Sequence, residues 1–406
     1  MSNVPKLRFK EFGGEWEEKK LGAVTTYVDY RGRAPIKTEN GNFLVTAKNI
    51  KKGFIDYACS KEYVSEDNYL NVMSKGLPEI GDVLFTTEAP MGNVAQVDIE
   101  NIALAQRVIK FRAKKMLLNS YLFHYMLSDI FQSLVTKKSI GTTVQGISGK
   151  ELHQTKLAFP SLQEQEKIAS FLTSVDTKIE QLTKKEALLQ EYKKGVMNKI
   201  FSQEIRFKDD DGSEFPEWEE KNLNELMYEH KERNYEKKYT KNDVLSVSGS
   251  HGIVNQIEFQ GRSFAGVSVD NYHIVKVDDI VYTKSPLKAN PYGIIKTNKY
   301  KDGIVSTLYA VYRPKECLFP QYINYYFEID DNVNKYLRPL VHKGAKNDMK
   351  INNQHVLSSY ISIPEKKEQT KIANFLSSID KKIELTTKEL NSTKEFKKAL
   401  LQQMFV

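Results

Sequence analysis

The sequence has few of the residues that usually carry crosslinks or bind metals. Its two cysteines, Cys59 and Cys317, stand far apart among 406 residues and suit neither a disulfide framework nor a metal cluster. The seven histidines are scattered without the spacing of metal ligands. No apolar run approaches the roughly 20 residues of a membrane-spanning helix, and the start, MSNVPKLRFKEF, lacks the apolar core of a signal peptide. These absences favour a protein of a reducing cytoplasm, without metal and without a membrane.

Motifs for catalysis are also missing. The stretch GTTVQGISGKE resembles a phosphate-binding P-loop, but Val144 stands where the first glycine belongs, and Glu151 replaces the needed Ser or Thr. NPYG from Asn290 resembles the Asn-Pro-Pro-Tyr loop of adenine methyltransferases with one proline fewer, and no glycine-rich turn upstream would hold a methyl donor. There is no G-x-S-x-G elbow and no convincing nuclease carboxylate cluster. We expect no catalysis by this chain alone and no cofactor bound to it.

The composition allows folded domains and a mild preference for anionic partners. Hydrophobic residues make up 40% and aromatic residues 11%, which is enough for globular cores. Lysine and arginine number 60 against 52 acidic residues, and the net charge of +8 favours nucleic acid over a membrane surface. The length suits two to three domains of about 150 residues each.

The main feature of the sequence is an internal repeat. PSLQEQEKIASFLTSVDTKIEQL from Pro160 returns as PEKKEQTKIANFLSSIDKKIELT from Pro364, and the match continues without a gap. A second pair, RFKEFGGEWEEKKL and RFKDDDGSEFPEWEEKNL, opens each half and carries the only two tryptophans, Trp16 and Trp218. The chain is therefore predicted to be a duplication of a globe followed by a helix. The predicted parts are the globe 1–158, the helix 159–202, the globe 203–362 and the helix 363–406.

Both repeated stretches are predicted to be long helices. Their apolar residues first recur at alternating steps of four and three, which is the seam of a coiled coil, and Lys and Glu fill the other faces. Ser161 with Glu164 has the form of a capping box. About 35 helical residues span about 50 Å. The predicted helix–helix packing positions are Ile168, Leu172, Val175, Ile179, Leu182, Leu189, Ile372, Leu376, Ile379, Ile383 and Leu390.

Each helix is expected to find its partner in the other one. The first helix leads from globe to globe, so the second, which starts at the second globe, would pack against it antiparallel. A local two-fold axis would then relate the helices and their globes, and the N-terminal RFK segment would lie near the end of the last helix. Further apolar positions are expected to await partner helices: Phe171, Leu188, Tyr192, Phe375 and Phe396.

Each globe is expected to be mixed α/β, with one sheet and few helices. Short β-type runs broken by turns include GDVLFTTEAPMGNVAQVD from Gly81 and IALAQRVIKFRA from Ile102, and the second globe matches the first of these with DDIVYTKSPLKANPYGIIKT from Asp278. An amphipathic helix is expected near 119–137 and again near 320–340.

Polar, basic and glycine-containing loops remain as functional candidates. Lys and Arg hold phosphates, while Arg, Asn, Gln and Ser read base edges, so clusters of them in both halves favour DNA binding over merely solvated loops. The candidates of the first globe are Arg31, Arg33, Lys37, Lys48, Lys51, Lys52, Lys137, Lys138, Thr142, Thr143 and Gln145. Those of the second globe are Ser248, Ser250, His251, Gln260, Arg262, Lys284, Ser285, Lys288, Lys343, Lys346 and Asn347.

The arrangement closely resembles the specificity subunit of type I restriction-modification systems. The resemblance runs the length of the chain, through the paired EQEKIASFLTSVDTKIEQL and EQTKIANFLSSIDKKIELT helices, YRGRAPIK, VTAKNI, and GDVLFTTEAP with its echo DDIVYTKSPL. The second globe departs from the RGRAP opening, where VLSVSGSHGIVNQ stands instead. This departure implies that the two globes read different sequences.

The resemblance implies a non-catalytic reader of double-stranded DNA in a bacterial or archaeal cytoplasm. Each globe would be a target-recognition domain for one half of a bipartite, asymmetric target. The helices would space the half-sites by about one to one and a half helical turns of DNA and dock two modification subunits. S-adenosylmethionine, ATP and Mg would sit only on those adenine methyltransferase subunits and on the motor-nuclease restriction subunits.

Two other functions remain open at this point. One is a self-sufficient DNA methyltransferase or nuclease, for which the sequence offers no methyl-donor or metal site. The other is a coiled-coil protein adaptor whose globes bind no DNA.

Overall fold

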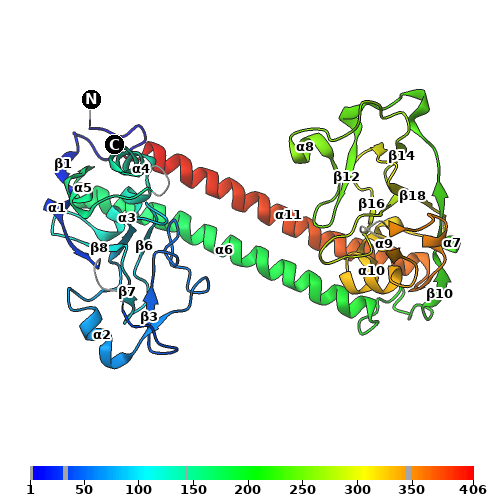
Figure 1. Cartoon of the computed structure of the whole chain (residues 1–406), viewed down its shortest axis with the longest axis horizontal. Helices are drawn as coiled ribbons and strands as arrows, with labels where there is room; N and C mark the ends of the chain where they lie inside the picture. The colour runs from blue at the N-terminus through cyan, green and yellow to red at the C-terminus, as the bar shows by residue number, and fades with distance from the viewer. Residues whose placement is uncertain (1–2, 31–34, 142–144, 344–348) are drawn as a thin grey trace. The chain divides into compact units, whose positions relative to one another are not determined.

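The structure is a computed structural model that describes residues 3–30, 35–141, 145–343 and 349–406. The chain divides into two compact units (Figure 1). Unit 1 comprises residues 1–184 and 387–406, and unit 2 comprises residues 185–386. Two long helices, α6 (Leu162–Phe201) and α11 (Lys366–Gln403), therefore contribute one part to each unit. Both are continuous and slightly longer than the sequence predicts.

Unit 1 is built on a four-stranded antiparallel sheet in the order β2-β8-β5-β6, with a smaller sheet of β4-β3-β7 and the pair β1-β9 beside it. Its strands are β1 (Glu17–Lys20), β2 (Thr25–Asp29), β3 (Asn42–Val45), β4 (Tyr63–Val64), β5 (Val83–Thr86), β6 (Val94–Gln96), β7 (Ala103–Leu104), β8 (Val108–Ala113) and β9 (Lys156–Phe159). Its own helices are α1 (Leu21–Val24), α2 (Glu66–Val72), α3 (Asn119–Leu127), α4 (Asp129–Lys138) and α5 (Gly149–Gln154). The predicted mixed α/β class is confirmed, but the prediction of one sheet in each globe is wrong, because the described strands of unit 1 are divided among these separate sheets.

Unit 2 repeats this plan with the sheet order β11-β18-β15-β16 and the pair β10-β21. Its strands are β10 (Glu219–Asn222), β11 (Met227–His230), β12 (Leu245–Ser248), β13 (Gly252–Asn255), β14 (His273–Val275), β15 (Ile280–Thr283), β16 (Ile295–Thr297), β17 (Gly303–Val305), β18 (Tyr309–Pro314), β19 (His342–Lys343), β20 (Met349–Lys350) and β21 (Tyr360–Ile363). Its own helices are α7 (Leu223–Leu226), α8 (Gln256–Gln260), α9 (Pro320–Tyr326) and α10 (Asp330–Leu337), with short 3-10 turns at 234–236, 241–243 and 355–357.

Strand register fixes which residues of the two units correspond. Val83 of β5 lies opposite Phe111 of β8, and Ile280 of β15 lies opposite Tyr312 of β18. Counting from these pairs, each residue of one sheet has a counterpart in the other. Sequence and register together therefore establish the internal duplication.

The helix predicted over 119–137 is wrong as a single element, because the chain breaks it at Ser128. Ser128 is extended at ψ 148°, its hydroxyl donates to the Tyr125 carbonyl at 2.6 Å, and its Oγ accepts from the Phe131 amide at 3.3 Å, so it ends α3 and caps α4. The helix predicted over 320–340 is likewise two helices, α9 and α10, separated by residues 327–329.

Within each unit the two helix segments run antiparallel, as predicted. In unit 1, Lys178 pairs with Glu389 at 2.8 Å, and Asp176, two residues earlier on α6, pairs with Lys397, further along α11. In unit 2, Lys193 pairs with Asp380 at 2.7 Å. The apolar stripes also enter the globular cores, since Leu172 is buried with the side chains of α3, and Leu376 with those of α9.

The two RFK segments hold the start of each long helix. Arg8 bonds both carboxylate oxygens of Glu164 at 2.8 Å, and Phe9 meets Phe171 edge to face at 5.8 Å. The predicted capping box is therefore only half formed: the Glu164 amide donates to Ser161 Oγ at 3.4 Å, but the Glu164 carboxylate goes to Arg8.

Unit 2 repeats the clamp with Arg206 on Glu368 at 2.9 Å and Phe207 against Phe375 at 5.5 Å. Phe171 and Phe375 are thus half-buried within their own units, and their contact with partner helices stays a prediction. Long side chains do remain exposed on the helices, at Leu188, Tyr192 and Phe396.

The N-terminal segment meets the end of the last helix, as predicted. The Leu7 amide donates to the Gln403 carbonyl at 2.9 Å, in the same way as the Ile205 amide donates to the Lys199 carbonyl at 3.1 Å where the chain runs on from α6. Ile205 and Lys199 are the repeat counterparts of Leu7 and Gln403. In unit 1, the hydrogen bond between the two chain-end segments therefore holds the first RFK segment beside α11 in the way that the continuous chain holds the second RFK segment beside α6.

Candidate nucleic-acid interface

The predicted helix-packing positions are mostly buried. Ile168, Leu172, Val175, Leu182, Ile372, Leu376, Ile379 and Leu390 are at most 8% exposed. Ile179, Leu189 and Ile383 are half-buried. Most of these side chains belong to the core of a unit, together with side chains from the end of the other long helix, so the first part of each long helix is packed into a globular core.

Two of the predicted DNA-binding lysines of unit 1, Lys37 and Lys48, line one cavity of about 300 Å³. Ala47 and Ala105 contribute apolar walls. Lys37 pairs with Glu62 at 2.9 Å and stays 59% exposed, so its charge is oriented without being buried. Arg31 and Arg33 lie outside the described residues.

The loop that carries Lys48, Lys51 and Lys52 is held from within by Asn49. This fully buried amide accepts from the Thr46 amide at 3.0 Å and donates to the Asp56 and Ser60 carbonyls, both at 2.9 Å. Lys51 Nζ donates to the Lys48 carbonyl at 2.7 Å, whereas Lys48 and Lys52 are exposed. The loop therefore presents cations on a backbone that a buried side chain fixes.

The predicted candidates around α4 diverge in their roles. Lys137 is exposed, but Lys138 donates to Thr155 Oγ1 at 3.3 Å and has a local partner. Gln145 is exposed in the loop that Ile140 and Gly146 close by a β-bridge, and the same loop bridges to Glu88. Thr142 and Thr143 lie outside the described residues.

In unit 2 the predicted serines form the tip of the β12–β13 hairpin. Ser250 Oγ lies 2.8 Å from Nδ1 of His251, whose ring packs at 4.9 Å from Phe259 of α8. The exposed Gln260 is the last residue of α8, and two residues later the guanidinium of Arg262 covers the Phe264 ring at 4.6 Å. This surface of unit 2 combines hydrogen-bonding groups with exposed aromatic rings.

The remaining candidates of unit 2 follow β15 and α10. Lys284 is half-buried, and burial lowers its pKa, while Ser285 and Lys288 are exposed. Lys343 belongs to β19, and the structure describes its backbone only. Lys346 and Asn347 lie outside the described residues.

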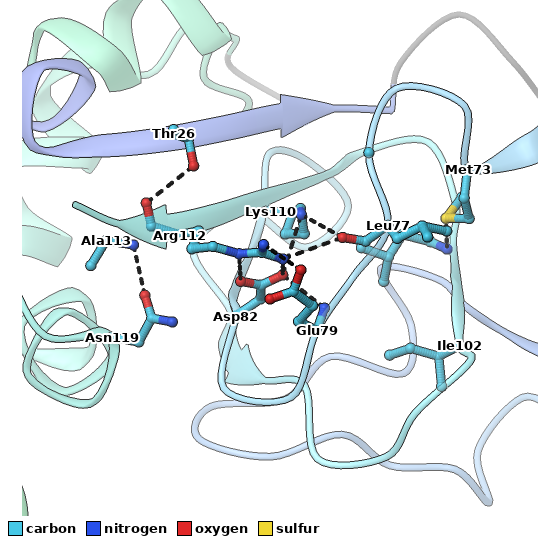
Figure 2. A network of polar contacts seen from close by, with 12 residues as sticks. Thr26, Met73, Leu77, Glu79, Asp82, Ile102, Lys110, Arg112, Ala113 and Asn119 are labelled. Atoms are coloured by element: carbon cyan, nitrogen blue, oxygen red, sulfur yellow. Dashed lines mark hydrogen bonds and ion pairs between the residues drawn. The ribbon is translucent and has the colours of Figure 1, made fainter. Parts of the chain in front are cut away.

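A polar network around the buried Asp82 ties the chain before β5 to Lys110 and Arg112 of β8 in unit 1 (Figure 2). Asp82 is 1% exposed and accepts two hydrogen bonds from Arg112, both at 2.7 Å, while Lys110 lies at 3.2 Å. Burial opposes the charge of Asp82, but Arg112, the Glu79 amide and Lys110 outweigh it and lower its pKa. Unit 2 keeps the core of this network, since Arg313 bonds Asp279 at 3.1 Å.

Sequence reasoning missed Gln106 and Arg107, which line the same cavity as Lys37 and Lys48. Both lie in the run IALAQRVIKFRA, which the sequence predicts to be β-structure throughout. They form instead the turn between β7 and β8, where Arg107 has a left-handed φ of 73°. Comparison of the two repeats was the signal that could have found them, because only one repeat has an arginine at this place.

The described residues offer little for other chemistry. No group of His, Cys, Asp and Glu within them could hold a metal ion, and both cysteines are exposed thiols. None of the described helices is long and apolar enough to cross a membrane.

Comparison with known proteins identifies the fold and the repeat. The family model described as the type I restriction modification DNA specificity domain matches residues 13–190 and again residues 216–395. The type I restriction enzyme MjaVIII specificity subunit of Methanocaldococcus jannaschii is 22% identical, over 97% of this chain and 94% of that relative.

Two solved structures share the fold. The type I restriction-modification S subunit from M. genitalium superposes with a TM-score of 0.62 at 14% identity, covering 99% of both chains. A chain from a structure of type I R-M complex assembly and conformational transition gives 0.52 at 17% identity, covering 95% of this chain and 96% of that one. With its family domain matched in both repeats, this chain belongs to the type I restriction-modification DNA specificity family.

Proposed function

We propose that this chain is the DNA-reading subunit of a type I restriction-modification complex and that each unit reads one half of a bipartite, asymmetric target. One observation carries the proposal: the same family domain occurs twice on the same strand plan, while the loops that end its strands differ. Repeated scaffolds with different loops suit two readers with different base preferences.

The chain itself supplies recognition, and its partners supply catalysis. In this complex, two modification subunits that bind S-adenosylmethionine methylate adenine, and restriction subunits that use ATP and Mg cleave DNA in the cytoplasm. Docking is supported by the exposed apolar side chains of the helices, of which Leu188, Tyr192 and Phe396 are 51–54% exposed. The length of α6, about 60 Å, supports its role as the spacer between half-sites.

The test is an exchange of residues 25–158 for the corresponding segment of another specificity subunit. Single-molecule sequencing of methylated adenines in a host that carries the chain and its modification subunit gives the target before and after the exchange. We expect one half-site to change while the other half-site stays the same. A change of both half-sites, or of neither, would contradict one reader per unit.

Two controls separate the rival functions. Incubation of the purified chain with DNA and a labelled methyl donor should leave the DNA unlabelled until the modification subunit is added, whereas a self-sufficient methyltransferase would label it. Gel shifts at low salt, with and without the modification subunit, should show a specific complex, whereas an adaptor without DNA binding would give none.

A further inference from the structure

The turn between β7 and β8 places one arginine in an unusual and firmly held position. Arg107 has φ 73°, a region that a residue with a Cβ rarely adopts and that proteins tend to retain where a side chain must be aimed. Its carbonyl accepts from the Thr87 amide at 2.9 Å and from the Thr87 hydroxyl at 3.3 Å. The backbone of Arg107 is therefore fixed to the end of β5.

The side chain of Arg107 is oriented as well. Its Nε lies 2.9 Å from Oε1 of Glu88, and both side chains remain exposed, at 47% and 43%. Within the described residues, Glu88 is the one charged group that pairs with it. The ion pair engages the inner nitrogen of the guanidinium, and Arg107 lines the cavity that Lys37 and Lys48 also line.

The second unit shows what changes when this position is not an arginine. By strand register, Arg107 corresponds to Leu308, which is 65% exposed, and Glu88 corresponds to Ser285. The cation and the carboxylate beside it are thus absent together from unit 2. Scaffold pairs such as Asp82–Arg112 and Asp279–Arg313 are kept in both units. A pair that differs while its surroundings are kept is expected of a reading position.

We propose that Arg107, aimed by Glu88, reads a guanine in the half-site of unit 1. A guanidinium fork donates two hydrogen bonds to O6 and N7 of guanine, which no other base accepts in the same way, and flanking lysines hold the phosphates. Leu308, which cannot donate, leaves unit 2 without this contact. The inference rests on the proposed function, since it assigns one base contact within it.

The experiment uses the complex of the full chain with its modification subunit. Duplexes carry the methylated target, with each guanine of the unit 1 half-site replaced in turn by 7-deazaguanine, which lacks the N7 acceptor. We expect the unsubstituted complex to lose affinity by about 10-fold or more at one guanine. The complex with Arg107→Ala should bind normal DNA more weakly by a similar factor, and 7-deazaguanine at that position should not weaken its binding further.

Matched variants separate base reading from charge. Arg107→Lys keeps the charge without the fork and should keep non-specific affinity while it loses discrimination. Glu88→Gln should weaken discrimination by less than Arg107→Ala. Lys52→Ala, which removes an exposed lysine, should weaken binding to all DNA sequences alike and reduce the salt dependence of binding. If Arg107→Ala behaves like Lys52→Ala, the side chain contacts a phosphate and the inference is wrong.

The half-site of unit 2 serves as an internal control, because Arg107→Ala should leave it unchanged in the methylated-adenine map. If the exchange of residues 25–158 moves one half-site but Arg107→Ala moves none, only the present inference fails. If no methylated target is found with the unsubstituted chain, the proposed function fails instead. Cooperative urea unfolding of Arg107→Ala, followed at Trp16, checks that unit 1 is folded.

Discussion

In each unit an ion pair between the two long helices lies where the globe packs against them. In unit 1 this pair is Asp176 with Lys397, beside the buried His124. In unit 2 the corresponding pair is Asp380 with Lys193, which also contacts Tyr325 and Glu328 of the globe. Tyr325 donates to Asp380 at 2.6 Å, and Lys193 lies 2.7 Å from both carboxylates. The ion pair between the helices is shared, but the group that the globe presents to it differs.

The polar atoms of His124 at the junction of unit 1 have fewer hydrogen-bond partners than those of Tyr325 at the junction of unit 2. Its Nδ1 lies 3.9 Å from Asp176 and has no hydrogen-bond partner, and its Nε2 lies 3.2 Å from Thr173 Oγ1. The tryptophans show the same contrast, since the Trp218 indole donates to Glu368 at 3.2 Å and the buried Trp16 indole has no such partner. The duplication has thus kept the shape of the junction and allowed its polar contacts to diverge.

The largest expected effect tests what the units share. Leu172→Ala and Leu376→Ala each empty a fully buried site at corresponding places in the helices, so each should cost about 2–5 kcal/mol of unfolding free energy. Each unit has a single tryptophan, so urea unfolding can be followed at Trp16 in a Trp218→Phe background and at Trp218 in a Trp16→Phe background.

We expect Leu172→Ala to shift the transition at Trp16 and Leu376→Ala the transition at Trp218. Leu188→Ala is the matched control, because this exposed side chain should change stability by less than about 0.5 kcal/mol. Equal shifts at both tryptophans for each variant would show that the two units unfold as one.

The second effect is a pH dependence that singles out unit 1's junction. Burial, and then the nearby Lys397, lower the pKa of His124 to about 3. The folded form therefore prefers neutral His124, so its contribution is complete above the unfolded pKa of about 6.5 and is lost as the pH falls toward 3. Below pH 6 the loss should be about 1.4 kcal/mol per pH unit.

His124→Tyr, which introduces the residue of unit 2, should flatten the dependence of the Trp16 transition between pH 6.5 and 5. The Trp218 transition should keep its own dependence, because burial, and then Arg233, lower the pKa of His273 in unit 2 to about 4. An unchanged slope at Trp16 would mean that His124 takes up its proton at the same pH in the folded and the unfolded chain, so that its pKa is not lowered by the fold.

The smallest effect tests the ion pairs. Lys193→Met leaves two carboxylates without their cation and should cost about 1–2 kcal/mol, since the Lys193 side chain is only 13% exposed. Lys397→Met leaves only Asp176 and should cost less, about 1 kcal/mol. Urea midpoints of the two variants, measured at the tryptophan of each unit, give the difference. Equal costs would show that Glu328 contributes nothing to the junction.

Much of the scaffold could be predicted because its signals are periodic and repeated. The steps of four and three in α6 and α11 give two long helices, and the second RFK segment marks the start of the second globe. The pattern could not show that Ser128 breaks the helix after β8, because a serine suits a helix and a cap alike until tertiary contacts choose. Nor could it show that Phe9 covers Phe171.

The candidate interface was less predictable than the scaffold. Its lysines are polar loop residues of a common kind, and their sequence positions do not say which ones share a cavity. Arg107 looked like part of a strand, and only its left-handed backbone and its closeness to Glu88 set it apart. Side-chain direction decides what an interface reads, and it depends on contacts between segments that are distant in the chain.

The sequence by itself determined the duplication, the helical seams and the mixed α/β class, because the apolar period and the repeat depend only on the order of residues along the chain. The tertiary structure alone decided which residues cap, clamp and pair across the junctions, and which cations meet at one cavity. These outcomes depend on short-range contacts between residues such as Arg8 and Glu164, far apart along the chain, and no local pattern encodes them.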